Sequence, residues 1–350
     1  MSHSRYETGV AEASPIMVSV GGFRVPAWVG RAKTGAARLP GPVQACLHYG
    51  WMVADGDRPR FASEALRKLM SCRPTTFRQK MMYKLSRDRR PLIAMFANKV
   101  AVRDFVSDTV GPHWLKETYA VATRAADLPW DDLPREVVLK VSHGSGGVIV
   151  VTELADPAVR LPSPHERRGW SKHLVHPDSV TRSEAEGLLD HWLSLRYGFG
   201  PGQSREWAYT TIAPRVVAEE LVGSSTELAR EIWFHCFDGV PRCCLFVKRN
   251  SEFDELACER LFDWEFDQAP EASGLSVEEW DDLVAATVAL ARTTDSVRVD
   301  WLVGSTGARF GELTNYPGAG RLAFNGHASL SAQEVHDLMS SYWNVPLRYE

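Results

Sequence analysis

Hydrophobic and polar positions along the chain follow two different periods, which together predict a mixture of helices and strands. Apolar residues recur at helical spacing in the segments 42–90, 99–108, 182–195 and 277–293. Short apolar runs rich in β-branched residues predict strands at 136–141, 148–152, 215–222, 232–237 and 243–247. No internal repeat or low-complexity tract is visible. The pattern therefore predicts an α+β fold with antiparallel hairpins in its later parts.

Turn signals join several of these strands into hairpins. The glycine-rich run Ser142–Gly147 separates the first two predicted strands, and Asp238-Gly239 separates the last two. Residues 128–134 contain two prolines and indicate a loop. The first 40 residues are rich in Gly, Ala and Pro and show little periodicity. We therefore expect a loose N-terminal arm before the first helical segment.

A further hairpin near the C-terminus alternates charged and apolar residues. Its first strand contains Arg298 and Asp300, which should share one face because side chains alternate along a strand. The residues expected to point from the other face into a core are Val297, Val299 and Trp301. After a Gly304–Gly307 turn, the returning strand should place a second set on one common face, namely Phe310, Glu312 and Thr314.

Pairing of these two strands would bring two carboxylates, Asp300 and Glu312, close to the guanidinium of Arg298. An additional oxygen could come from Thr314 or Asn315. Ligand sets made only of oxygen suit Mg²⁺ far better than Zn²⁺, and a guanidinium suits an anion. The hairpin therefore predicts a site for a hard cation and a phosphate. The alternative is an edge hairpin with solvated charges.

A second candidate site lies at the first predicted hairpin. Lys140 stands on a strand immediately before the glycine-rich tip, where its ammonium could reach phosphates covered by backbone N–H groups of the tip. The tip is neither a P-loop nor a dinucleotide fingerprint, because it lacks Gly-Lys-Ser/Thr and is followed by Val148–Val151 rather than by a helix. A flexible turn is the alternative interpretation.

The strand that ends at Glu219 and Glu220 continues into Leu221, Val222 and Gly223. The apolar part of this segment could lie against the edge of an adenine ring. The alternative is an acidic strand end exposed to solvent.

Composition limits the functional classes. The chain has 350 residues, 44% of them hydrophobic and 24% charged, with a net charge of −4. These values are ordinary for a folded domain protein and predict no general attraction to nucleic acid or anionic lipid. No stretch reaches 18 apolar residues and the N-terminus lacks an apolar leader, so we expect no membrane insertion and a cytoplasmic location.

Two local features remain open at this stage. Basic residues crowd the segment Lys80–Arg90, which predicts either a solvated helix face or a docking surface for an anionic substrate or polymer. The six cysteines show no C-x-x-C pair, and Cys243-Cys244 lies in an apolar run. We expect buried thiols there rather than metal or redox chemistry.

Several ordered motifs give the chain a resemblance to a known family. They are the segments 90–92, 98–103, 138–147, 205–209, 214–220, 298–300 and 311–314. Together they resemble the ATP-grasp superfamily, and more closely its TupA-like branch, which is associated with teichuronopeptide and other cell-surface polymer biosynthesis. The resemblance covers roughly residues 75–325. It implies a nucleotide, ATP with Mg²⁺, held between two α+β subdomains after a mainly helical N-terminal region.

The resemblance also implies roles for individual positions. The implied nucleotide-binding residues are Lys99, Lys140, His143, Gly144, Ser145, Gly146, Gly147, Glu219, Glu220, Leu221, Val222 and Glu231. The implied metal ligands are Asp300, Glu312, and Thr314 or Asn315. We expect the catalytic groups to be Arg298, Lys140 and Arg260. The chain departs from the family pattern at Trp233, where relatives usually have a lysine, and at Asn315, which is displaced behind Thr314.

The expected organisation has three parts. Residues 1–90 form the N-terminal arm and a helical substrate-side region, 91–220 the first ATP-grasp subdomain with its glycine-rich flap, and 221–350 the second subdomain with the Mg²⁺ site. The implied activity is an ADP-forming carboxylate–amine ligase that forms an amide through an acyl phosphate. Its expected partners are a small or polymer-linked carboxylate and an amine such as an amino acid or peptide. A kinase and a non-catalytic nucleotide-binding protein are the alternatives, and a homodimer is one candidate oligomeric state.

Overall fold

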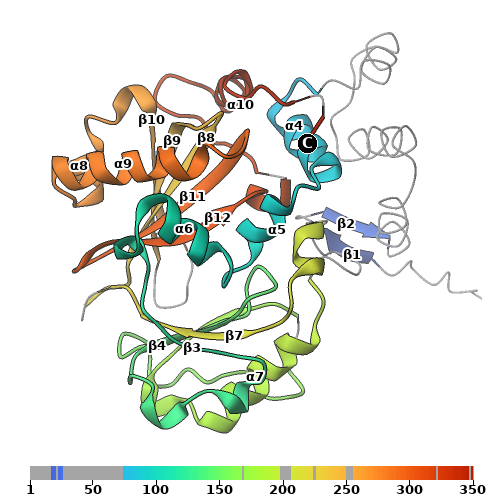
Figure 1. The fold of residues 1–350 in the computed structure, drawn as a ribbon, viewed down its shortest axis with the longest axis vertical. Helices are drawn as coiled ribbons and strands as arrows, with labels where there is room; N and C mark the ends of the chain where they lie inside the picture. The colour runs from blue at the N-terminus through green and yellow to red at the C-terminus, as the bar shows by residue number, and fades with distance from the viewer. Residues whose placement is uncertain are drawn as a thin grey trace, which may run out of the picture.

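The computed structural model describes residues 17–20, 23–26, 74–167, 169–197, 206–223, 226–249, 255–320, 322–346 and 348–349. These residues form two five-stranded sheets and a separate two-stranded hairpin. Each large sheet has its own covering helices, and the two layers face each other across the middle of the molecule (Figure 1). The predicted α+β class is confirmed.

The first sheet contains the glycine-rich hairpin. Its strands are β3 (Thr118–Ala122), β4 (Val137–Val141), β5 (Val148–Val151), β6 (Lys172–Val175) and β7 (Val216–Glu219), in the order β3-β7-β4-β5-β6. Only β5 and β6 run parallel among these neighbours. Helix α7 (Arg182–Ser194) packs Leu188, Leu189 and Trp192 against the apolar face. The helix begins with a reciprocal cap between Thr181 and Glu184.

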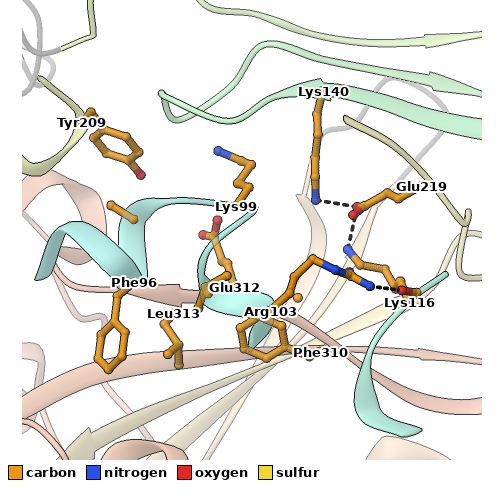
Figure 2. Close-up of a pocket in the computed structure, with 13 residues that line it drawn as sticks. Phe96, Lys99, Arg103, Lys116, Lys140, Tyr209, Glu219, Phe310, Glu312 and Leu313 are labelled. Carbon is orange, nitrogen blue, oxygen red and sulfur yellow. Dashed lines mark hydrogen bonds and ion pairs between the residues drawn. The ribbon is translucent and has the colours of Figure 1, made fainter. Parts of the chain in front are cut away.

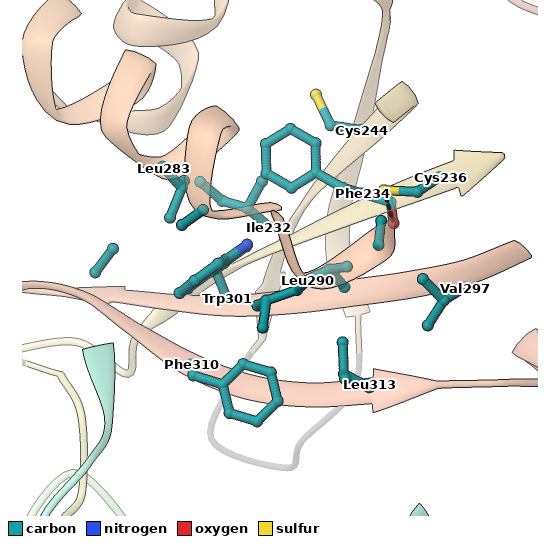
Figure 3. Close-up of a cluster of buried hydrophobic side chains, with 14 of the residues drawn as sticks. Ile232, Phe234, Cys236, Cys244, Leu283, Leu290, Val297, Trp301, Phe310 and Leu313 are labelled. Atoms are coloured by element: carbon teal, nitrogen blue, oxygen red, sulfur yellow. Dashed lines mark hydrogen bonds between the residues drawn. The ribbon is translucent and has the colours of Figure 1, made fainter. Parts of the chain in front are cut away.

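The second sheet is antiparallel throughout. Its strands are β8 (Arg230–Phe237), β9 (Val240–Arg249), β10 (Glu255–Phe262), β11 (Ser296–Gly304) and β12 (Gly307–Thr314), in the order β10-β9-β8-β11-β12. Ile232 and Phe234 on β8, and Trp301 on β11, point from one face into a core (Figure 3). Val299 of β11 belongs to the same core. Helices α6 (Val102–Val110) and α9 (Val277–Ala291) complete that core.

The opposite face of the second sheet is covered at one end only. There, Phe77 of α4 (Phe77–Arg87) and Trp343, which follows α10 (Ala332–Ser341), pack against Phe237 of β8. The rest of this face, toward Glu231, forms one wall of a cavity described below. Because strand side chains alternate, one sheet thus supplies an apolar core and a polar wall.

The remaining elements are short. They are β1 (Met17–Val20), β2 (Phe23–Pro26), α5 (Pro91–Ala97), α8 (Ala269–Ser273), η1 (Pro112–Trp114), η2 (Ala125–Asp127), η3 (Trp130–Asp132), η4 (Pro177–Ser179), η5 (Trp207–Thr211), η6 (Asp263–Glu265) and η7 (Pro317–Gly320). β1 and β2 pair within the segment that was expected to be a loose arm. No helix in the described part of the chain is both long and apolar enough to cross a membrane.

The hairpins predicted from turn signals are confirmed, because β4–β5, β8–β9 and β11–β12 all pair antiparallel. The helix expected over 99–108 is present but begins at Val102. The side chain of Asn98 accepts hydrogen bonds from the backbone N–H groups of Val100 and Ala101, which delays the first helical turn. Most of the helical region expected over 42–90 lies outside the described residues, apart from α4.

Two of the basic residues in the segment Lys80–Arg90 fit neither sequence interpretation. Lys84 is completely buried and donates hydrogen bonds to Asp295 at 2.8 Å and to the carbonyl of Ser296 at 2.6 Å. Lys80 donates to the carbonyls of Ser340 and Trp343. These two ammonium groups therefore join α4 to the C-terminal part of the chain rather than facing solvent or a docked polymer. The expected burial of Cys243 and Cys244 is confirmed.

Candidate functional site

A cavity of about 330 Å³ lies between the two sheets. Lys140 and Glu219 reach it from the first sheet, and Arg298, Asp300 and Glu312 from the second. Many of the residues singled out from the sequence line it, namely Lys99, Lys140, Ser145, Gly146, Glu219, Glu220, Leu221, Val222, Glu231, Arg298, Asp300 and Glu312. The size falls within the range of small-molecule sites.

Asp300 and Glu312 face each other across the β11–β12 pair. A β-bulge follows this pair, so that Trp301 pairs with Phe310 and Gly311 is the extra residue. Phe310 therefore turns into the core, where its ring packs edge-on against Trp301 at 6.1 Å. The expectation that Phe310 would share a face with Glu312 was wrong. Strict alternation failed because the bulge inserts one residue.

Gly311 is needed at the bulge for a steric reason. A Cβ atom on this residue would lie 2.8 Å from the carbonyl oxygen of Asp300. No side chain fits there without a backbone shift. The glycine thereby keeps the two carboxylates in register.

Arg298 links the two carboxylates. Its guanidinium forms a two-pronged hydrogen bond with Asp300, at 2.7 and 2.5 Å, and lies 3.4 Å from Glu312. Burial, with the like charge of Glu312, raises the pKa of Asp300 to about 8 against the opposing effect of Arg298. The charges of Arg298 and Lys99 hold the pKa of Glu312 below its usual range. Glu312 is the more open of the two, with a side chain that is 48% exposed.

Thr314 and Asn315 occupy opposite sides of the strand end. The hydroxyl of Thr314 lies 2.8 Å from Glu312 and 3.5 Å from Asp300. Asn315 instead points into the protein and donates to the carbonyl of Ile93 at 2.9 Å. The structure therefore brings Thr314, and not Asn315, to the carboxylate pair.

These oxygens fit Mg²⁺ in number and type. Within the described ranges, no cluster of three or more His, Cys, Asp or Glu side chains forms a metal site. The protein would supply Asp300, Glu312 and the hydroxyl of Thr314. Mg²⁺ is ordinarily held by one or two carboxylates together with water and substrate phosphates, so this donor set is sufficient.

On the first sheet, Lys140 does not stand alone (Figure 2). Its ammonium lies 2.5 Å from Glu219, and the same carboxylate oxygen accepts a hydrogen bond from Lys116 at 2.7 Å. Burial, together with the charge of Lys116, lowers the pKa of Lys140 to about 7 despite the attraction of Glu219. Glu219, which the resemblance assigned to the adenine segment, is thus held by two lysines. Lys116 was not identified from the sequence, because a single lysine before a strand has no distinguishing pattern.

The glycine-rich tip is divided between two roles. Ser145 and Gly146 line the cavity, whereas Gly144 and Gly147 pack under the indole of Trp170. A Cβ atom on Gly144 would lie 2.7 Å from that ring. Gly144 is therefore required by Trp170, whereas a Cβ atom on Gly147 would lie 2.7 Å from Val141 and 3.1 Å from Trp170. Lys99 crosses from the other layer and donates to the carbonyl of Gly144.

His143 belongs to the same packing arrangement. Its ring is buried, lies 5.1 Å from Trp170 and is within hydrogen-bond distance of the carbonyl of Leu195. The imidazole does not line the cavity. The structure therefore places His143 behind the tip, although the sequence grouped it with the nucleotide residues.

The segment Glu220–Val222 also lines the cavity, together with Leu228 and Leu302. Glu231 also lies on the wall, but both its oxygens are engaged. Arg249 forms an ion pair with it, and the indole N–H of Trp233 donates to it at 2.9 Å. Arg249, like Lys172 on β6, was not expected to be in the site.

Arg260 is separate from the cavity. Its guanidinium donates to the carbonyl of Asn325 at 2.9 Å and lies over the ring of Phe324 at 5.6 Å. β10 is the edge strand, two strands away from β8, so the sheet itself keeps Arg260 from Asp300. Its expected catalytic role has no geometric support here.

Comparisons with known proteins bear on this site. The sequence profile of the TupA-like ATP-grasp family matches residues 201–329. No curated protein gave a significant match. One similar solved structure is a D-alanine–D-alanine ligase from Bacillus anthracis complexed with ATP, with 13% identity, 80% of this chain and 83% of that chain covered, and a TM-score of 0.39. Another is the ATP-grasp ligase PsnB with a minimal precursor, with 14% identity, 72% of this chain covered and a TM-score of 0.35. The chain spans 62% of the length of PsnB.

The matched profile covers the second sheet, which carries Arg298, Asp300 and Glu312. It also covers β7 of the first sheet, which carries Glu219. The resemblance that the motifs implied is therefore confirmed over residues 201–329, which identifies this chain as similar to the TupA-like ATP-grasp family.

Proposed function

We propose that this protein is an ATP-dependent carboxylate–amine ligase. One observation carries the proposal: the paired carboxylates Asp300 and Glu312 share a cavity wall with Arg298, and Lys140 faces them from the other sheet. Such a cavity offers a cation site beside an anion site, which a triphosphate requires. The match to an ATP-grasp family supports the same conclusion.

The proposed reaction has two steps. A carboxylate oxygen of the substrate attacks the γ-phosphorus of ATP, and the bond to the ADP oxygen breaks, which leaves an acyl phosphate and ADP. The amine nitrogen then attacks the acyl carbon, loses a proton and displaces phosphate to form the amide. No covalent enzyme intermediate is needed, so catalysis rests on positioning and on charge stabilisation.

Residues of the chain divide this work. Lys99 and Lys140 neutralise phosphate charge, and backbone N–H groups at Ser145 and Gly146 cover the phosphates. Arg298 stabilises the transferring phosphoryl group. Mg²⁺ bound at Asp300, Glu312 and Thr314 would supply Lewis-acid polarisation of the phosphate oxygens. Closure of the tip over the site would protect the acyl phosphate from water.

Apolar side chains support a position for the adenine base of ATP. Val138, Val148 and Val150 of the first sheet line the cavity together with Leu221 and Val222. A purine ring in that position would remove its faces from water. The amine and carboxylate would approach from the opposite end, near Thr314. The family resemblance supports a role in cell-surface polymer or natural-product biosynthesis, for which we propose a cytoplasmic location.

The experiment measures ADP release in a screen of amino acids and uronic acids as carboxylate donors, with and without a second amine. Hydroxylamine in place of the amine should trap the acyl group as a hydroxamate. Carboxyl-¹⁸O substrate should transfer one label to the released phosphate. A kinase would leave phosphate on its product and form no hydroxamate. Release of AMP and pyrophosphate would overturn the proposal, and absence of any ATP turnover would favour a non-catalytic nucleotide-binding protein.

A further inference from the structure

Trp233 lies in the cavity wall, and the proposed reaction gives it no role. It lies on β8 directly opposite Asp300 of β11, on the polar face of the second sheet. Its neighbours Ile232 and Phe234 point to the core on the other side. The indole is therefore presented to the cavity beside the carboxylate pair.

The indole stacks on the guanidinium of Arg298. The Cζ atom of Arg298 lies 4.2 Å from the ring centroid, which is well within cation–π range. The edge of the same guanidinium is hydrogen-bonded to Asp300. Trp233 thus covers the face of the guanidinium, and Asp300 binds its edge. Together they restrict both the tilt and the rotation of the guanidinium.

The indole is itself fixed on two sides. Its N–H donates to Glu231 at 2.9 Å, and Glu231 is paired with Arg249. The guanidinium of Arg249 lies 5.8 Å from the indole centroid. The sequence Arg249, Glu231, Trp233, Arg298 is therefore a continuous chain of contacts that ends at Asp300.

We propose that Trp233 is a positioning residue for Arg298: its ring keeps the guanidinium aimed at the space above Asp300 and Glu312 where the phosphoryl group transfers. The inference rests on the proposed function for its chemical consequence and on the stack itself for its geometry. A positioned cation matters most when charge spreads over the phosphoryl oxygens. Loss of the ring should therefore weaken stabilisation of transfer much more than it weakens ground-state nucleotide binding.

Two variants and a matched control test this. Trp233→Leu removes the aromatic face, whereas Trp233→Phe keeps a face and loses only the N–H donor. Trp264→Leu is the control, because Trp264 is 55% exposed, stacks on Phe262 at 4.6 Å and does not line the cavity.

The first measurement is the affinity of the full-length protein for MgADP alone and for MgADP with aluminium fluoride, a mimic of the transferring phosphoryl group. The wild type should bind the second combination more tightly. In Trp233→Leu the gain should fall by about tenfold to thirtyfold while MgADP affinity stays close to normal. Trp233→Phe should recover most of the gain, and Trp264→Leu should behave as the wild type. An unchanged gain in Trp233→Leu would overturn the proposal.

The second measurement needs neither turnover nor a nucleotide. The Nε–H resonance of Arg298, assigned through Arg298→Lys, should carry an upfield ring-current shift in the wild type. That shift should vanish in Trp233→Leu and persist in Trp264→Leu. A resonance that does not move refutes the positioning role. The wild type could show the ring-current shift and yet bind MgADP with aluminium fluoride no more tightly than MgADP alone. That result would support the contact between Trp233 and Arg298 and would contradict the proposed phosphoryl transfer.

Discussion

Asp300 and Glu312 are cross-strand partners, and the β-bulge at Gly311 begins directly beyond them. The register places the two carboxylates on the cavity wall and returns Phe310 to the core. A slip of one residue would move Glu312 to the apolar face. The site therefore depends on one irregularity in an otherwise regular hairpin.

The carboxylate pair gives the first prediction. Asp300→Asn and Glu312→Gln should each abolish nearly all ATP turnover, roughly a thousandfold, because each removes a ligand charge without changing side-chain volume. The expected change in the melting temperature is smaller for Glu312→Gln, whose side chain is half exposed, than for buried Asp300→Asn. Steady-state kinetics at several Mg²⁺ concentrations and calorimetry would check this. Near-normal turnover in either variant would contradict the metal assignment.

Gly311 gives the second prediction. Gly311→Ala should lower the free energy of unfolding by about 1–3 kcal/mol, because its Cβ must displace the carbonyl of Asp300. Activity should fall further than this loss of stability explains, since the displaced residue is a proposed ligand. Gly307→Ala is a useful comparison, because an added Cβ there would meet only the end of the Arg309 side chain, at 4.0 Å. Gly307 has a positive φ of 90°, so this variant strains the backbone without moving Asp300. Equal activity in both variants would show that the bulge is not critical.

Lys140 gives a prediction about pH. A bound phosphate should raise the pKa of Lys140 above its value of about 7 in the free protein. Binding then takes up a proton above pH 7, so ATP affinity should decline as the pH rises from 7 to 9. Calorimetry across that range measures the slope. In Lys140→Met the affinity should be lower at pH 7, and this slope should disappear. A slope that persists in the variant would assign the proton to another group.

The buried pair Lys84–Asp295 gives a prediction about stability. Burial acts to raise the pKa of Asp295, but Lys84 and hydrogen bonds from Trp343 and Tyr349 hold it below the usual range. A carboxylate with a depressed pKa stabilises the fold above its unfolded pKa of about 3.9, and this contribution is lost as the pH falls further.

Asp295→Asn should therefore cost about 3–5 kcal/mol at pH 7, because Lys84 would be left buried without its partner charge. The difference from the wild type should shrink below about pH 4. Urea unfolding at pH 7, 5 and 3 would measure it. A constant difference at all three pH values would mean that packing, and not the ion pair, causes the loss.

Alternation along single segments was enough to predict much of the site. Val297, Val299 and Trp301 are buried in the core as expected, and Arg298 and Asp300 lie together on the opposite face. These positions depend on strand geometry, which is a local property. The placement of Lys140 before a glycine-rich turn was predictable for the same reason.

Other features required contacts between distant segments. Phe310 turns inward only because of the bulge next to Asp300. His143, Gly144 and Gly147 pack against Trp170, which belongs to a later segment. Arg260 was expected to be a catalytic cation, but it lies on the edge strand β10, away from the cavity. No periodicity within a segment records which residue of another segment will lie against it.

The sequence by itself therefore determined the three hairpins β4–β5, β8–β9 and β11–β12 and the faces of Arg298 and Asp300 on their strand. Only the tertiary structure decided that Lys84 is buried against Asp295, that Glu219 is shared by Lys116 and Lys140, and that Trp233 stacks on Arg298. The physical reason is that the period of a helix or strand sets the direction of each of its side chains. The charge state and the partner of a side chain depend instead on the distant segments that the fold packs against it.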